Sequence, residues 1–158
     1  MTDVEKIVWA ALGAIAVYIV GQLLSKFFIE PLHELRKAVG EVRFNLAFHA
    51  PTIHTPIGRT PEKSSAAQEA LMKSSCDLIA KLHAVPIYQL TRLLAVGALP
   101  SRKPVEQAAV QLRGLSTYVH ETGEKANTSI DVINKRVAAI MRLLRLKPLA
   151  GENDVPYG

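Results

Sequence analysis

The chain has 158 residues, of which 49% are hydrophobic and only 6% aromatic, with a net charge of +5 and a mean hydropathy of +0.15. This length suits one domain of ordinary size. The single cysteine excludes a disulfide framework and a cysteine-based zinc site. The composition predicts a helix-rich protein with part of its chain outside a water-facing fold.

The first apolar segment predicts a transmembrane helix. Residues 7–25 contain no charged side chain, and a helix of that length rises about 28 Å, close to the thickness of the bilayer hydrocarbon core. Trp9 near one end and Lys26 at the other suit the two headgroup zones. The acidic N-terminal flank and the missing small-residue cleavage site argue against a cleaved signal peptide. A buried core helix is the remaining alternative.

The basic residues on either side of the span set its expected orientation. Only Lys6 precedes the span, whereas Lys26, Arg36, Lys37 and Arg43 follow it. Because positive charge stays on the cytoplasmic side, the bulk of the chain is expected in the cytoplasm. The expected organisation is a short N-terminus with the span over residues 1–30, a helical bundle over 31–148 and a polar tail over 149–158.

Apolar spacing beyond the span predicts a bundle of about four helices. After Pro31 the apolar residues recur at alternating steps of three and four, which is typical of one helical stripe. Its members are Leu32, Leu35, Val39, Val42 and Leu46. This first helix is expected to be long or kinked and to end before Pro51, with a loop over 51–59. Thr60 then reads as an N-cap. Further helices are expected over 61–83, 86–96 and 101–123, and over a last segment that ends at Pro148.

Two sets of residues are candidate contacts with a second copy or a protein partner. One is the stripe after Pro31, which could pack within the chain or between chains. The other is the small residues of the span, which let helix backbones approach closely in lipid. These are Ala10, Gly13, Ala14 and Gly21. The alternative is that glycine and alanine are merely common in spans.

Basic residues are concentrated near the C-terminus, where residues 135–147 hold five basic side chains and no acidic one. Such a face is expected to lie against anionic membrane lipid. The candidates are Lys26, Lys135, Arg136, Arg142, Arg145 and Lys147. A nucleic-acid role is disfavoured because no aromatic residues interleave with these charges. A solvated face is the other alternative.

Arg43 and His49 are the candidate catalytic residues. Their R-x5-H spacing resembles the signature of the HEPN ribonucleases, an all-helical family. That resemblance implies proton transfer by His49 and phosphate binding by Arg43. Residues six apart lie about 120° apart around a helix, and the alternative is a surface arginine and a helix-end histidine. Without metal-ligand spacing or a phosphate loop, no metal, cofactor or enzyme activity is expected.

Two resemblances extend these expectations. The stretch FFIEPLHELRKAVGEV resembles the membrane-exit segment of small bacterial single-pass proteins, which implies the bacterial inner membrane. By layout the chain resembles the membrane accessory proteins of RNA-targeting CRISPR effectors, which join a span to a HEPN-like domain and assemble into pores. The leading hypothesis is a membrane-anchored structural or interaction protein that oligomerises or docks a partner. The alternatives are a pore-forming effector of phage defence and a HEPN-like ribonuclease.

Overall fold

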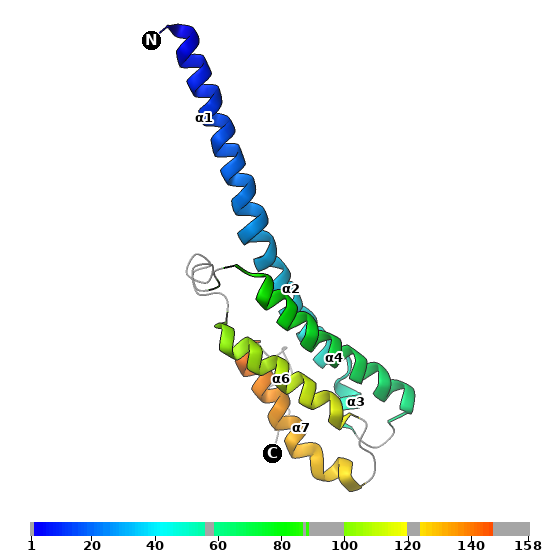
Figure 1. Ribbon diagram of the computed structural model, residues 1–158. Coiled ribbons are helices and arrows are strands. Elements are labelled where there is room, and N and C mark those ends of the chain that lie inside the picture. The colour runs from blue at the N-terminus through cyan, green and yellow to red at the C-terminus, as the bar shows by residue number, and fades with distance from the viewer. Residues whose placement is uncertain (1, 56–58, 87, 89–99, 120–123, 147–158) are drawn as a thin grey trace.

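The fold of this chain is helical throughout its described part. The computed structural model describes residues 2–55, 59–86, 88, 100–119 and 124–146. Within these ranges every regular element is a helix, and Figure 1 shows a long N-terminal helix that extends well beyond a bundle of shorter ones. The predicted all-α class, an apolar N-terminal helix followed by packed helices, is confirmed.

The N-terminal helix is continuous from Asp3 to Phe48, over 46 residues. It comprises α1 (Asp3–Leu24), a π-helical turn (Ser25–Ile29) and α2 (Glu30–Phe48). At its start the Thr2 backbone N–H donates to Glu5 Oε2 at 2.8 Å, which satisfies one backbone donor of the chain end. The predicted long first helix, ending before Pro51, is confirmed.

The π-helical turn lies directly before Pro31. Proline has no N–H, and its ring crowds the carbonyl group four residues earlier, which here belongs to Phe27. In the wider turn the Glu30 N–H donates to the Ser25 carbonyl, one residue further back than in an α-helix. The extra residue therefore accommodates Pro31 without ending the helix, so the apolar segment and the bundle stay joined by one helix.

A short helix, α3 (Ala50–His54), follows α2 almost at once. A loop was expected over 51–59, and that prediction is wrong for residues 51–54. Proline is favoured in the first turn of a helix because its missing N–H would find no intrahelical partner there, and Pro51 has this position. Ile53 is only 1% exposed, so burial of one apolar side chain helps to hold the helix.

The other described helices are α4 (Pro61–Ala84), α6 (Arg102–Tyr118) and α7 (Glu124–Leu143). Thr60 is the N-cap of α4 as predicted, because its hydroxyl accepts the Lys63 N–H at 3.3 Å. Most of the predicted helix over 86–96 lies outside the described residues. The same holds for the expected helix stops at Gly123 and Pro148 and for the tail over 149–158.

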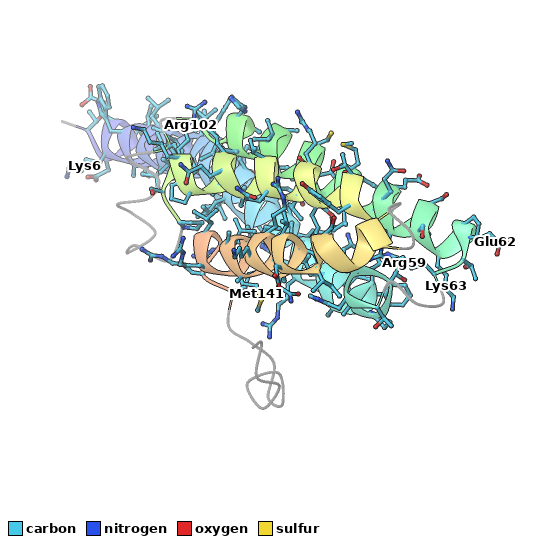
Figure 2. All side chains as sticks on the ribbon, turned by 90° about the horizontal axis from the view of Figure 1, so that it is seen from below. Lys6, Arg59, Glu62, Lys63, Arg102 and Met141 are labelled. Atoms are coloured by element: carbon cyan, nitrogen blue, oxygen red, sulfur yellow. The ribbon has the colours of Figure 1, made fainter. Side chains whose placement is uncertain are left out.

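Packing in the bundle follows the order of the chain. Helix α4 packs on both α2 and α6, α6 packs on α7, and α3 contacts both α4 and α7. Because α2, α4, α6 and α7 alternate in direction, the start of α6 and the end of α7 lie at the end of the bundle nearer α1 (Figure 1). In Figure 2, Arg102 accordingly lies towards Lys6, whereas Glu62 and Lys63 lie at the opposite end. We call the first of these the α1-proximal end.

The apolar stripe of α6 forms the middle of the core. Its members are completely buried, and each buried valine or leucine contributes about 1.5–3 kcal/mol to folding. They are Val105, Ala108, Leu112, Leu115 and Val119. Helix α7 adds Ile133 and Ile140, both at 0% exposure. The three-and-four spacing thus identifies the core-facing side of these helices.

The stripe of α2 belongs to the same core, which corrects the contact surface expected from it. Leu35 and Val42 are 0% exposed and Leu46 is 8% exposed, while Leu32 and Val39 are partly buried against them. Because α4 packs on α2, these side chains are covered within one chain. The stripe therefore stabilises the fold of each copy, and Leu35 and Val42 offer no surface to a second copy or a partner.

Candidate functional site

Helix α1 is left uncovered by the described residues of the bundle. Every residue over 2–24 is exposed, including the apolar side chains of Trp9, Ile15 and Val17 at 65%, 55% and 74%. In the described part of the chain, one helix, Asp3–Phe48, is long and apolar enough to cross a membrane, and its most apolar stretch is unburied. An apolar surface of this extent on a monomer marks a contact with lipid or protein.

The small residues of α1 do not all share one face. At 100° per residue, Ala10, Ala14 and Gly21 fall within about 40° of one another, whereas Gly13 lies about 80° to the side of their centre. Gly13 and Gly21 have open space where a Cβ atom would be, and both alanines are exposed. The face formed by Ala10, Ala14 and Gly21, called here the small face, is covered by no described part of this chain.

The polar residues at the end of the apolar segment of α1 are also exposed. Gln22, a strongly polar residue within the apolar segment, is exposed. Lys26 is exposed in the π-helical turn, next to Phe27 at 58% exposure. A lysine whose stem lies along apolar surface while its ammonium reaches the interface is the usual arrangement at the end of a span.

Arg43 lies on α2, and His49 lies at the C-terminal end of the same helix. His49 joins α2 to α3, and its ring meets the Phe48 ring edge-on, with centroids 5.0 Å apart. Phe48 in turn stacks on Phe44. Partial burial lowers the pKa of His49, favouring the neutral imidazole. No hydrogen bond links Arg43 to His49 in the described part of the chain.

The predicted membrane-facing basic residues fall into two groups. Lys26, Lys135, Arg142 and Arg145 are exposed, whereas Arg136 is partly buried. Lys147 lies outside the described residues. Lys26, Lys135 and Arg142 are thus exposed at the surface, as contact with an anionic membrane would require.

Arg136 packs helix α7 against α6 and is not available to a membrane surface. Its Nη1 donates to Gln111 Oε1 at 2.8 Å, and its guanidinium carbon lies 5.4 Å from the centre of the Tyr118 ring. A Cβ at Gly114 would overlap the guanidinium, so a glycine there makes room for it. The buried Nε has no hydrogen-bond partner. Arg136 therefore contributes to helix packing and does not have the membrane-facing position expected for it.

Arg59 is an organising residue that the sequence analysis missed. Its Nε donates to the Thr52 carbonyl at 2.7 Å and its Nη2 to the Ile53 carbonyl at 2.8 Å, while Nη1 reaches the Tyr118 carbonyl at 3.3 Å. The guanidinium therefore joins the C-terminal ends of α3 and α6, where a cation is favourable. Arg59 lies near the start of α4 and the end of the bundle away from Arg102 (Figure 2).

Polar contacts also join α2 to α4 and α3 to α7. Asn45 Nδ2 donates to Ser74 Oγ at 2.8 Å, and His54 Nδ1 lies 2.9 Å from Asn134 Oδ1. Lys81 Nζ and Glu34 Oε2 form an ion pair at 2.5 Å. That contact lowers the pKa of Glu34 and raises the pKa of Lys81. All three contacts fix helices against each other, so their evident role is structural.

The described residues were also compared with the requirements of a metal site, and the chain with known proteins. No three histidine, cysteine or acidic side chains in the described ranges are placed to hold a metal ion. Comparisons with protein-family models, curated proteins and solved structures found no match to this chain. The functional conclusion therefore rests on the geometry of the chain itself.

Proposed function

We propose that this protein is a single-pass membrane protein that holds a helical bundle at the cytoplasmic face of a bacterial inner membrane and self-associates through its span. The observation that carries the proposal is the continuous helix Asp3–Phe48. Its first half is fully exposed and apolar, whereas its second half contributes buried residues to the bundle core. Apolar surface is unfavourable in water by about 25 cal/mol per Å², and a bilayer removes this penalty.

The absence of a break between α1 and α2 supports a structural role. The π-helical turn carries the helix past Pro31, so the span and the bundle are not separated by a flexible linker. A rigid connection of this kind sets the distance and tilt of the bundle relative to the bilayer. It suits an anchor or scaffold, whose task is to hold a folded domain in place.

Self-association is supported by the small face of α1. Ala10, Ala14 and Gly21 lie together on the helix and are exposed. In lipid, where the hydrophobic effect does not drive helices together, association depends on close backbone packing, which small residues permit. The partner proposed is therefore the same face of a second copy.

The single native cysteine provides a direct test of the topology. Cys76 lies exposed on α4. A membrane-impermeant maleimide added to intact spheroplasts should leave Cys76 unlabelled, and permeabilising the membrane should allow labelling. As the matched control, a Cys76→Ser, Thr2→Cys variant should be labelled in intact spheroplasts. The membrane fraction should also retain the protein after alkaline carbonate extraction.

Two results would overturn the proposal. Labelling of Cys76 in intact spheroplasts would place the bundle on the outer side of the membrane. Release of the protein by carbonate would show that α1 does not span the bilayer, and the exposed apolar helix would then be a contact with protein.

A further inference from the structure

A shallow groove of about 520 Å³ lies between α6 and α7. Its apolar lining includes Val110, which is 64% exposed, and Leu143. Its polar lining includes Lys103 and Arg142, contributed by the two different helices. Apolar surface beside paired cations suits a ligand that carries a negative group next to hydrocarbon.

The groove is positive on balance. Lys103 and Arg142 are both exposed, and neither forms an ion pair with a carboxylate among the described residues. Glu106 also lines the groove, but its Oε1 accepts the Arg102 Nε–H at 3.0 Å. The acidic side chain is thus already paired with a cation, and the charges of Lys103 and Arg142 remain available.

The groove lies at the α1-proximal end of the bundle. Lys103 is in the first turn of α6 and Arg142 is in the last turn of α7, and both helix ends lie towards α1 (Figure 1). Lys26 is exposed in the π-helical turn between α1 and α2. It adds a further cation between α1 and the bundle. The groove therefore belongs to the part of the bundle nearest any membrane that α1 crosses.

We propose that this groove binds the headgroup of an anionic phospholipid in the leaflet beside the bundle. Lys103 and Arg142 contact the lipid phosphate, and Val110 and Leu143 lie against the glycerol and the upper acyl chains. The inference rests on the proposed function, because α1 must hold the bundle at a membrane. Charge complementarity with an anionic leaflet favours lipid as the occupant, and the tether keeps that ligand at high local concentration.

The test uses the full chain with Cys76→Ser and a Val110→Cys substitution that carries an environment-sensitive fluorophore. The protein is reconstituted into vesicles of phosphatidylcholine alone or of phosphatidylcholine mixed with phosphatidylglycerol, each with a headgroup-labelled quencher lipid. We expect marked quenching in the phosphatidylglycerol vesicles and little in phosphatidylcholine. The double variant Lys103→Glu, Arg142→Glu should lower quenching to the phosphatidylcholine value.

A matched double variant separates local binding from overall charge. Lys63→Glu with Lys73→Glu, both exposed on α4, changes the net charge equally and should leave the quenching intact. Equal quenching in both vesicle types, or quenching that survives the Lys103 and Arg142 reversals, would overturn the proposal. An unquenched fluorophore in both types would also overturn it, and would make an acidic segment of another protein the better occupant.

Co-flotation of the protein with both vesicle types is measured in the same samples. Flotation that resists carbonate, combined with an unquenched fluorophore, refutes the lipid site and leaves the anchor standing. Failure to float in either vesicle type refutes the anchor itself.

Discussion

Arg136 and Arg142 show how two arginines on one helix differ in what they contribute. Arg136 donates to Gln111 and lies over the Tyr118 ring, whereas Arg142 is exposed. We predict that Arg136→Ala lowers the free energy of unfolding of the bundle by about 1–2 kcal/mol, through loss of a charged hydrogen bond and a cation–π contact.

The matched change Arg142→Ala should alter the free energy of unfolding by no more than about 0.5 kcal/mol. Urea denaturation in detergent, followed by circular dichroism, measures both variants. Equal effects of the two substitutions would show that the Arg136 contacts do not stabilise the bundle.

We expect His49 to make the stability of the bundle depend on pH near neutrality. Its pKa is lowered from 6.5 by burial, so the unfolded chain takes up a proton at a higher pH than the folded one does. The stability that the neutral imidazole contributes is therefore present above pH 6.5 and is lost as the pH falls through the folded pKa. We predict that the melting temperature falls between about pH 7.5 and pH 5.5.

The replacement His49→Gln should remove part of that fall. The control His33→Gln, at an exposed position on α2, should retain it. Thermal denaturation across this pH range measures both variants. An unchanged slope in His49→Gln would assign the pH dependence to another group.

In helix α2, a substitution at Leu35 distinguishes a role in the core from a role in a contact between chains. Because Leu35 is 0% exposed and α4 packs on α2, Leu35→Ala should lower the free energy of unfolding by about 2–5 kcal/mol. Under native conditions it should leave the mass of the detergent-solubilised assembly unchanged. Leu12→Ala, the same change at an exposed position on α1, should leave bundle stability unaltered. If Leu35→Ala dissociates the assembly without destabilising the bundle, the α2 stripe is a contact between chains and not part of the core.

The same element shows what a sequence pattern can and cannot predict. A three-and-four spacing identifies the apolar side of a helix, and the burial of Leu35, Val42 and Leu112 confirms it. The spacing does not say what covers that side, since an α2 stripe buried under α4 and one buried under a second chain have the same sequence.

Other parts of the structure depend on contacts that no local pattern encodes. Pro51 predicts a loop because proline often ends a helix, whereas in the structure it lies in the first turn of α3. Arg59 contacts the Tyr118 carbonyl from 59 residues away along the chain. Arg136 belongs by charge to a basic segment, and only the placement of Gly114 and Tyr118 shows that it packs inward.

For the whole molecule, the continuous helix Asp3–Phe48 joins an exposed apolar segment to a folded bundle. The bundle buries Leu35, Val42 and Leu46 of α2 and leaves all of α1 exposed. If α1 crosses a membrane as proposed, association within the bilayer depends on α1, and the small face is the part of α1 that permits the closest approach of two backbones.

Self-association through α1 is tested by the molar mass of the detergent-purified protein, measured by size-exclusion chromatography with light scattering. We predict a defined oligomer for the native chain and a monomer for Ala14→Leu, in which a larger side chain blocks the small face. Ala16→Leu, the same change about 140° from the centre of that face, should remain oligomeric. A monomeric native protein, or an oligomer that persists in Ala14→Leu, would contradict self-association through α1.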